Sequence, residues 1–284
     1  MRRKILLPTD FSKNAWHAIK YALELYKKDN CDFYILNVFS STGNIMMSLT
    51  NLEPGSGLFE MEKAKSKNGL KKIIDLLKIQ EYNNPKHHFE AISVFNNPLE
   101  AIKNIVEKKD IELIIMGTKG ATDARKTAYG STAISVMEKV RNCPVIVVPE
   151  KAKHFLPKEI VFTTSYKTHY KRRELNNLID IAKKCDAKIA VFHVSEESKL
   201  NNIQKENKQM LEEIFEEVAY SFHELSNYPL ETAIKVFIES RDSDMLAFIN
   251  KKHWFFGSVL TQPLVKDIGF NSKVPVLVMH DLRN

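Results

Sequence analysis

The sequence contains an internal repeat, and this repeat limits the possible folds more than any single motif does. Residues 5–11 (ILLPTDF) align with residues 160–166 (IVFTTSY), and residues 142–147 (NCPVIV) align with residues 273–278 (KVPVLV). Two copies of one pattern in one chain predict two copies of one structural unit. We therefore expect a first unit at residues 1–150, a linker at residues 151–158 and a degenerate second unit at residues 159–284.

Each copy alternates short apolar segments with stretches of helical periodicity. Ala15, Ala18 and Ala22 form part of one apolar helix face, and Ser12 is placed to cap that helix. The segment 111–116 (IELIIM) is typical of a strand buried on both faces of a parallel sheet. The alternation predicts an α/β fold, with an open parallel sheet in each unit and helices on both of its faces. In the first unit we expect strands at residues 4–8, 33–39, 89–94, 111–116 and 145–148, helices from Pro98 and over residues 132–140, and a long loop at residues 40–60 that opens into a helix.

The composition excludes several classes of protein. No apolar run of the 284 residues approaches the roughly 20 that a membrane-spanning helix needs, and the apolar stretch near the start, residues 5–7, is too short for a secretion signal. Three cysteines without CxxC spacing predict neither a disulfide framework nor a zinc site, so we expect a reducing, cytoplasmic location. The net charge of +7 comes from 42 basic and 35 acidic residues that are interleaved, which favours a solvated surface over nucleic-acid contact.

A glycine-containing segment follows the buried strand. It reads Gly117-Thr118-Lys119-Gly120 and, nine residues later, Gly130-Ser131-Thr132. Glycines at such a place let the backbone approach a ligand without a Cβ atom in the way. The second element opens a helix, whose first N–H groups and dipole attract anions. Because ligands of open parallel sheets bind beyond the carboxyl ends of the strands, Asp10 would lie at the same edge and could accept hydrogen bonds from a ribose or an adenine amino group.

Each of these residues also has a purely structural explanation. Glycines after a strand often only form a turn, and Gly130-Ser131 could serve only as a helix cap. The chain has nine glycines, however, and three of them occur here together with a preceding strand, a following helix and Asp10, which favours a ligand site. Lys119 and Arg125 are equally compatible with phosphate contacts and with exposed charges on a loop.

The segment GTKGATDARKTAYGST resembles the nucleotide motif G-x2-G-x9-G-[S/T] of the ATP-binding universal stress proteins. The segments ILLPTDFS, NVF, NNPLEAI and NCPVIVVP resemble the same family in order and spacing, and the resemblance covers essentially the whole chain as a tandem pair. It implies a five-stranded parallel sheet of order 3-2-1-4-5 in each unit, with ATP or a related adenine nucleotide bound in each competent unit. Ala133 departs from the family pattern, because a hydroxyl residue is often found there.

The resemblance also implies roles for individual residues. The end of the first strand would hold the base and the ribose, Val38 would meet the adenine through its backbone, and the glycine segment would surround the sugar and the phosphates. The first turn of the next helix would bind the phosphates. The nucleotide-binding residues implied in this way are Pro8, Thr9, Asp10, Val38, Met116, Gly117, Thr118, Lys119, Gly120, Gly130, Ser131 and Thr132, and we expect no catalytic residue and no metal ligand.

The second copy has lost the features that make the first copy attractive as a nucleotide site. Side chains at the former glycine positions would obstruct a ligand, and Pro263 stands where a helix-opening N–H is wanted. We therefore expect that this copy does not bind nucleotide in the same mode. The residues that correspond are Ser165 to Asp10, Ile249 to Gly117, Lys252 to Gly120, Thr261 to Gly130 and Gln262 to Ser131. The basic and aromatic residues 251–258 are either a packed loop or a partner surface, and we favour packing.

The leading hypothesis is a cytoplasmic stress or regulatory protein that binds ATP or another adenine nucleotide, with or without magnesium, in its first unit. We expect at most slow hydrolysis, because no general base or arginine finger is identifiable. The alternative is a protein–protein interaction scaffold without a physiological nucleotide, and a phosphoryl or adenylyl transferase is a third reading. The last strands, residues 145–148 and 276–279, commonly make the dimer contact in this family. We therefore expect self-association through them, within the chain as a pseudo-dimer or also as a homodimer, while no particular protein partner is indicated.

Overall fold

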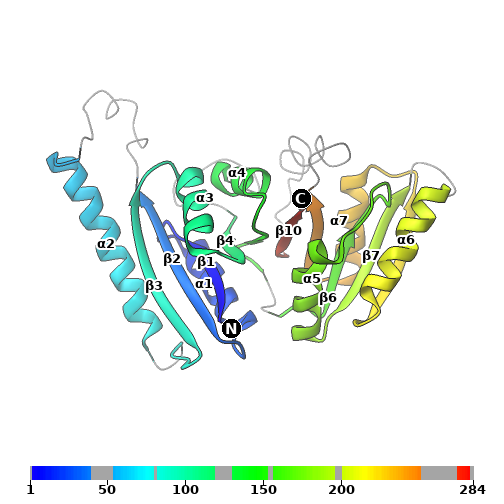
Figure 1. Ribbon diagram of the computed structural model, residues 1–284, viewed down its shortest axis with the longest axis horizontal. Helices are drawn as coiled ribbons and strands as arrows, with labels where there is room; N and C mark the ends of the chain where they lie inside the picture. Colours follow the sequence, from blue (N-terminus) through cyan, green and yellow to red (C-terminus); the bar gives the residue numbers. More distant parts are fainter. Residues whose placement is uncertain are drawn as a thin grey trace.

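The computed structural model describes residues 2–39, 54–79, 82–118, 130–152, 156–195, 200–250 and 274–281. Within them, ten strands form one continuous sheet (Figure 1) in the order β3-β2-β1-β4-β5-β10-β9-β6-β7-β8. The first half of the chain contributes β1 (Arg3–Pro8), α1 (Lys13–Leu25), β2 (Cys31–Phe39), α2 (Gly57–Leu77), β3 (His87–Phe95), α3 (Pro98–Lys109), β4 (Leu113–Gly117), α4 (Ser131–Lys139) and β5 (Val145–Val148). The second half contributes β6 (Glu159–Thr163), α5 (Arg172–Cys185), β7 (Lys188–Ser195), α6 (Asn202–Phe215), β8 (Tyr220–Ser226), α7 (Leu230–Arg241), β9 (Met245–Asn250) and β10 (Val276–His280).

The strand order confirms the predicted topology. The first half has the order 3-2-1-4-5, and β8-β7-β6-β9-β10 repeats it in the second half. Neighbouring strands within each half are parallel. Strand ends differ from the prediction by one or two residues, and the start of α2 is the one helix boundary that corrects the expected loop, because α2 begins at Gly57, within the range 40–60. The Ser56 hydroxyl accepts a hydrogen bond from the Phe59 N–H at 3.2 Å and so caps the helix earlier than the apolar pattern suggests.

Helices cover both faces of the sheet, and the strands serve both layers. Along β1, Ile5 and Leu7 pack with the layer of α1, α2, α5 and α6, whereas Leu6 packs with the layer of α3, α4 and α7. All three side chains are fully buried. Strands buried on both faces are nearly continuous in apolar residues, which explains why β1 and β4 are so apolar in sequence.

Local signals in the sequence position two of the helices that surround the candidate site. The Ser12 hydroxyl accepts a hydrogen bond from the Ala15 N–H at 3.1 Å, which confirms the expected cap of α1. Pro98 occupies the start of α3 as predicted, and the Asn97 side chain accepts from the Leu99 N–H at 3.0 Å. No helix among the described residues is both long enough and apolar enough to cross a bilayer.

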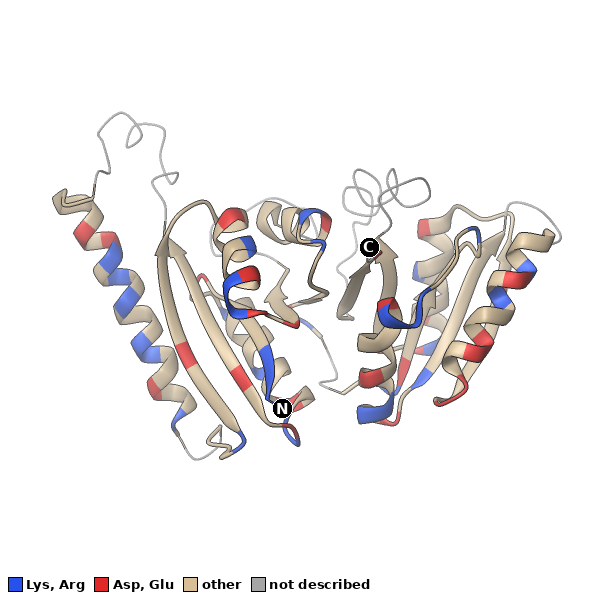
Figure 2. Cartoon of the chain, in the orientation of Figure 1, with Lys and Arg blue, Asp and Glu red and all other residues tan. Residues whose placement is uncertain are grey.

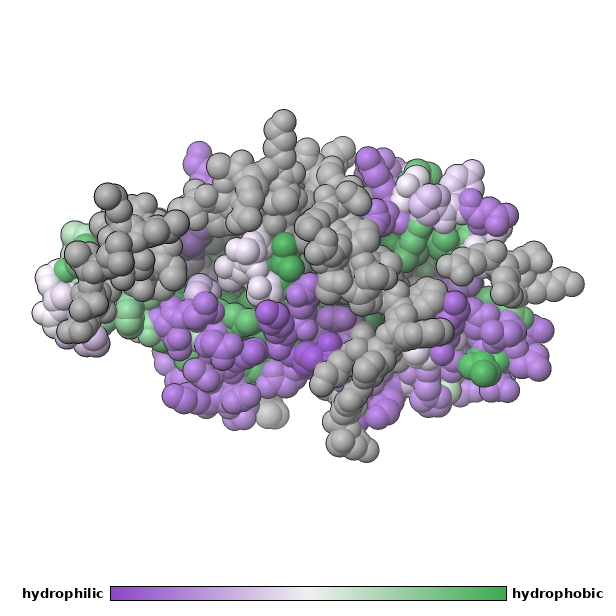
Figure 3. Space-filling view, turned by 90° about the horizontal axis from the view of Figure 1, so that it is seen from above, coloured by the Kyte–Doolittle hydropathy of each residue, from purple (hydrophilic) through white to green (hydrophobic). Residues whose placement is uncertain are grey.

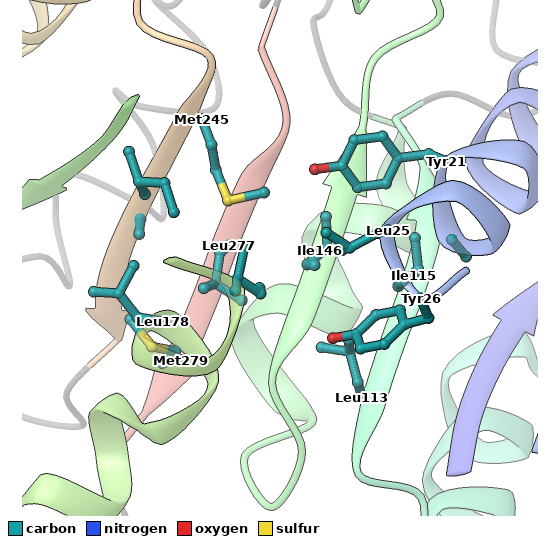
Figure 4. Close-up of a cluster of buried hydrophobic side chains, with 14 of the residues drawn as sticks. Tyr21, Leu25, Tyr26, Leu113, Ile115, Ile146, Leu178, Met245, Leu277 and Met279 are labelled. Atoms are coloured by element: carbon teal, nitrogen blue, oxygen red, sulfur yellow. The ribbon is translucent and has the colours of Figure 1, made fainter. Parts of the chain in front are cut away.

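The two halves join along β5 and β10, which pair antiparallel with Ile146 opposite Leu277. Figure 4 shows side chains of α1, β4 and β5 on one side of this junction and those of α5, β9 and β10 on the other. All of them belong to one buried cluster. The last strands of the two halves, which we expected to self-associate, therefore pair with each other within one chain. Pairing between two chains stays a prediction.

Charged residues reinforce the junction and cover the outer surface. Lys184 of α5 pairs with Asp29 at 2.6 Å, and Arg3 pairs with Asp180. On the outer helix α2, basic and acidic residues are interspersed (Figure 2), with Lys63 and Lys65 each paired to a glutamate three residues earlier. This distribution agrees with a solvated face, and the absence of nucleic-acid binding stays a prediction.

Candidate functional site

The candidate site lies where β1 and β4 end side by side in the sheet. The two strands are parallel neighbours, with Ile5 opposite Leu113. The chain leaves β1 toward α1 on one face of the sheet, but it leaves β4 toward α4 on the other face. The point at which successive connections go to opposite faces opens a crevice in doubly wound folds. Figure 3 shows the molecule from above the view of Figure 1, which is the side at which β2 and β3 end. On this side, hydrophobic residues are exposed between hydrophilic ones.

The end of β1 is a tightly bonded turn. Pro8 is the last residue of β1 and half-buried, and Thr9 is 7% exposed. The Thr9 N–H donates to the Leu36 carbonyl at 2.8 Å, and the Thr9 carbonyl accepts from the Asn37 amide at 2.7 Å. The Thr9 hydroxyl accepts the N–H of Phe11, whose φ of 66° turns the chain sharply. These bonds fix the backbone of the turn against β2.

Asp10 is the charged member of this turn, and like Phe11 it is exposed. One of its carboxylate oxygens accepts the Ser12 N–H at 3.1 Å, which directs the carboxylate along the start of α1. The side chain remains exposed at the sheet edge. A carboxylate held in this way can accept hydrogen bonds from hydroxyl or amino groups of a bound molecule.

The end of β4 is held against α1. The Asn14 amide, 5% exposed, donates to the Val148 carbonyl at 3.0 Å, and its carbonyl oxygen accepts from the Thr118 hydroxyl at 3.2 Å. A Cβ atom on Gly117 would lie 2.5 Å from that same Asn14 oxygen. The crowding atoms at Gly117 thus belong to α1, which gives this glycine a structural reason beyond the expected approach of a ligand.

The start of α4 lies next to the end of β4. The Gly130 N–H donates to the Thr118 carbonyl at 2.7 Å, so that the two described ends of the glycine segment touch each other. Gly130 is the N-cap residue of α4 and has no side chain with which to cap it. Ser131 is exposed and Thr132 is half-buried. The N–H groups of this first turn point out of the helix, and the helix dipole favours an anion there.

The remaining expected site residues lie on the face of α3 and α4 or outside the described chain. Met116, 6% exposed, belongs to the buried core of that face, and Val38 packs against it from β2. Lys119 and Gly120 lie outside the described residues. No cluster of acidic, histidine or cysteine side chains suited to a metal ion occurs in the described part of the chain.

The second half repeats the backbone of the turn and packs it tightly against the layer of α5 and α6. The Thr164 N–H donates to the Phe192 carbonyl at 3.0 Å, and the Thr164 carbonyl bonds to His193 at 2.9 Å, as the Thr9 carbonyl does to Asn37. Tyr166 is only 2% exposed and packs on the His193 ring with centroids 4.8 Å apart. Burial lowers the pKa of His193, which keeps its ring neutral.

Amide side chains of α6 bond to the same turn. Gln204 donates to the Ser165 carbonyl at 3.0 Å, and Asn207 donates to the Tyr166 carbonyl at 2.7 Å. On the β9 side, the pairing of Ile160 with Met245 places Ile249 at the position of Gly117, and Ile249 is 4% exposed. Lys252, Thr261, Gln262 and the stretch 251–258 lie outside the described residues.

Two residues that build the site were not identified from the sequence. Both are buried amides: Asn14 ties the ends of β4 and β5 to α1, and Asn37 ties the turn after β1 to β2. Each was visible as a lone amide within an apolar element, Asn14 in the first turn of α1 and Asn37 inside a strand. Buried amides need hydrogen-bond partners, and this requirement is the signal that could have identified them.

Comparisons with known proteins agree on one family. The model of the universal stress protein family matches residues 1–149. Universal stress protein MJ0531 of Methanocaldococcus jannaschii is 30% identical over 155 residues, which are 53% of this chain and 84% of that protein. Universal stress protein YxiE of Bacillus subtilis is 26% identical over 152 residues, or 52% of this chain and 99% of its own.

A solved structure extends the similarity to both halves. The crystal structure of a universal stress protein from Archaeoglobus fulgidus covers 97% of this chain and 95% of its own, with a TM-score of 0.70 and 20% sequence identity. At this identity the similarity shows the fold alone. It therefore supports the tandem α/β architecture across the whole chain.

Proposed function

The chain belongs to the universal stress protein family, and from this premise we propose that its first half binds ATP or a related adenine nucleotide as a stress or regulatory protein with little or no turnover. The observation that carries the proposal is the hydrogen bond between the Gly130 N–H and the Thr118 carbonyl. Through this bond the open first turn of α4 lies at the end of β4, one strand away from Asp10 at the end of β1. An anion site and a carboxylate therefore share one edge of the sheet.

The phosphates would lie at the start of α4. The N–H groups of Ser131, Thr132 and Ala133 belong to the first turn, where they have no partner within the helix. The two hydroxyl groups of this turn add donors, whereas Ala133 is buried and adds only its N–H. Phosphate binding at helix N-termini uses this combination of N–H groups and dipole.

The base would lie beyond the end of β1, along the backbone of Val38. β1 ends at Pro8, opposite Leu36, while β2 continues to Phe39. The Leu36 carbonyl points toward β1 and accepts the Thr9 N–H. Backbone groups of alternate residues in a strand point the same way, so those of Val38 point toward the space that β1 has vacated. A planar base with donors and acceptors on its edge fits such a backbone, and Asp10 would lie beside the ribose.

Slow turnover follows from the residues at this edge. Among the site residues that the structure describes, Asp10 carries the one carboxylate, and it already accepts the Ser12 N–H. Fast phosphoryl transfer needs a positioned base and cationic groups around the transferred phosphate. We further place the protein in a reducing cytoplasm, since its three cysteines are free and two of them are buried.

A pair of substitutions at Gly130 tests the phosphate site. Its φ of −73° and ψ of 159° suit any residue, so Gly130→Asp and Gly130→Asn both place a capping side chain at α4, and both share the cost of adding a side chain at this buried position. Only the aspartate places a negative charge against the phosphates. We expect calorimetry on nucleotide-stripped protein to show ATP binding that Gly130→Asp weakens by about tenfold or more, the effect of roughly 1.4 kcal/mol, and Gly130→Asn weakens less.

Wild-type protein without a calorimetric or thermal-shift response to millimolar ATP, ADP and AMP would contradict the proposal and leave the scaffold function. Sustained phosphate release that is lost in Asp10→Ala would instead indicate a true transferase or hydrolase. Addition and chelation of magnesium in the same titrations determine whether the nucleotide binds with the metal.

A further inference from the structure

One buried amide connects the two strand ends that flank the candidate phosphate site. Asn14 lies in the first turn of α1 and is 5% exposed. Its amide nitrogen donates to the carbonyl of Val148, the last residue of β5, at 3.0 Å. Its oxygen accepts from the hydroxyl of Thr118, the first residue after β4, at 3.2 Å. A single side chain on a helix thus joins the ends of two neighbouring strands.

The backbone closes the same connection from the other side. The Thr118 N–H donates to the Val148 carbonyl at 3.2 Å, so this oxygen accepts from both Thr118 and Asn14. The Thr118 carbonyl in turn accepts the Gly130 N–H at 2.7 Å. Thr118 therefore transmits the position of Asn14 to the residue from which α4 begins.

The space around Gly117 is shaped to this amide. A Cβ atom on Gly117 would lie 2.5 Å from the Asn14 oxygen and 2.8 Å from its Cγ atom. Real Cβ atoms do not approach other atoms so closely, and a larger residue at this position would displace the amide from Val148 and Thr118. The first glycine of the nucleotide-type segment is thus required by Asn14.

We propose that Asn14 is a positioning residue of the nucleotide site. Its carboxamide holds Thr118 against the end of β5 and thereby sets where Gly130 and the first turn of α4 present their N–H groups to the phosphates. The role rests on the proposed nucleotide binding. Because Asn14 is buried, it acts through Thr118 and Gly130 and does not itself contact the nucleotide.

A positioning role predicts different effects on ATP binding and on adenosine binding, whereas a general contribution to stability does not. The Asn14 connection reaches the phosphate side through Thr118 and α4, whereas the base side is formed by Val38 and the turn at Thr9. Loss of the amide should therefore weaken the binding of ATP and leave the binding of adenosine nearly unchanged. A merely destabilised protein would lose both ligands in equal measure.

The second half provides a matched control. Asn207 is also 5% exposed, and its amide also donates to a backbone carbonyl, that of Tyr166, at 2.7 Å. Asn207→Ala removes a buried amide of the same kind at the corresponding edge of the other half. It should lower the unfolding temperature about as much as Asn14→Ala does, with no change in the ratio of ATP to adenosine affinity.

The experiment measures dissociation constants for ATP and for adenosine by calorimetry in wild type, Asn14→Ala, Thr118→Val, the double variant and Asn207→Ala. We expect each of the first two substitutions to weaken ATP binding about tenfold, the scale of one lost buried hydrogen bond, with adenosine binding changed by less than about twofold. Since both substitutions break the same hydrogen-bond network, the double variant should bind ATP about as weakly as whichever single variant binds ATP more weakly.

The possible failures are distinguishable. Equal weakening of ATP and adenosine in Asn14→Ala, strict additivity in the double variant, or behaviour identical to that of Asn207→Ala would overturn the positioning role while the nucleotide function stands. Wild-type protein that binds neither ligand would overturn the proposed function and this role together. Should Asn14→Ala fail to fold, Thr118→Val, which keeps the volume of the side chain and the Asn14–Val148 bond, decides the question alone.

Discussion

The two halves build the same polar turn at the end of their first strand and use it in opposite ways. In the first half, Phe11 is 41% exposed and Asp10 lies open at the sheet edge. In the second half, Tyr166 is 2% exposed, and amides of α6 bond to the carbonyls of Ser165 and Tyr166. The backbone of the turn is thus set by the fold, whereas the side chains of the neighbouring helix determine how far the turn is exposed.

Substitutions at the end of the fourth strand of each half, at Ile249 of β9 and Gly117 of β4, should change the free energy of unfolding most. Ile249→Ala leaves a cavity at a position that is 4% exposed and should lower the free energy of unfolding by about 4 kcal/mol. Gly117→Ala introduces the Cβ atom that meets Asn14 at 2.5 Å and should cost about 2 kcal/mol by overpacking. Chemical denaturation of both variants measures these losses.

The same two variants should also differ in ATP affinity. We expect Gly117→Ala to lose ATP affinity, and we expect Ile249→Ala to gain none, because the second half has Ser165 in place of Asp10 and Thr261 in place of Gly130. Both variants therefore belong in the same calorimetric titration. If Ile249→Ala bound ATP at a second site, the Ile249 side chain alone would be what keeps nucleotide out of the second half.

Acid should act on the second half through His280, the last residue of β10. The side chain is 4% exposed, and burial together with the nearby Arg141 lowers its pKa to about 4. The folded state therefore favours neutral His280, so its contribution to stability is complete above the ordinary pKa of 6.5 and is lost as the pH falls from 6.5 to 4. The shift corresponds to about 3 kcal/mol.

His280→Gln tests this contribution without removing the polar side chain. Denaturant titrations at pH 7, 6, 5 and 4 should show a smaller loss of stability in the variant than in wild type. The first half has Pro149 at the corresponding position of the repeat, which cannot titrate. Identical slopes of stability against pH in both proteins would refute the assignment of this loss to His280.

Much of the fold was predictable because the features that determine it are local. The apolar run of β4, the cap at Ser12 and the proline at the start of α3 each determine their own element. The repeat then predicted that the second half would copy the first, and the strand order confirms it. The start of α2 was missed, because Ser56 caps the helix well before Leu70, the first of the apolar residues from which the helix was predicted.

The candidate site was less predictable, because its residues meet only in three dimensions. Spacing predicts Gly117 and Gly130 as a pair, but the reason for Gly117 lies in Asn14, which is distant in sequence. Likewise, the sequence shows that Asp10 is replaced by Ser165, yet nothing local indicates that Gln204 and Asn207 of α6 would bond to that turn. Such contacts follow from packing and from the need to satisfy buried polar groups.

His193 and Asn37 offer a smaller test of the comparison at one equivalent position. Both bond to the carbonyl of the threonine in the turn, at 2.9 Å and 2.7 Å, but only the histidine can titrate. Burial lowers the pKa of His193, and its bond to Thr164 opposes that shift. Stability should therefore fall as the pH drops below the ordinary histidine value, and by less than for His280.

His193→Asn copies the first half into the second and should flatten this part of the pH dependence. Urea denaturation between pH 7 and pH 5 measures it against wild type. Since the asparagine can form the same bond to the Thr164 carbonyl, the variant should remain folded at neutral pH. A steeper pH dependence in the variant would be evidence against a neutral, buried His193.

The smallest change in stability is expected from the ion pair between Lys184 and Asp29, which joins the two halves. Lys184 and Asp29 pair at 2.6 Å with side chains 15% and 34% exposed, whereas Ile146 and Leu277 of the apolar seam are fully buried. Ion pairs that water still reaches, as here through Asp29, contribute about 1 kcal/mol, whereas apolar burial acts over the whole seam. Asp29→Asn should therefore lower stability by at most about 1 kcal/mol, and the difference from wild type should shrink in 1 M salt. If the two halves of this variant unfolded in separate transitions, the charges rather than the continuous sheet would hold the pseudo-dimer together.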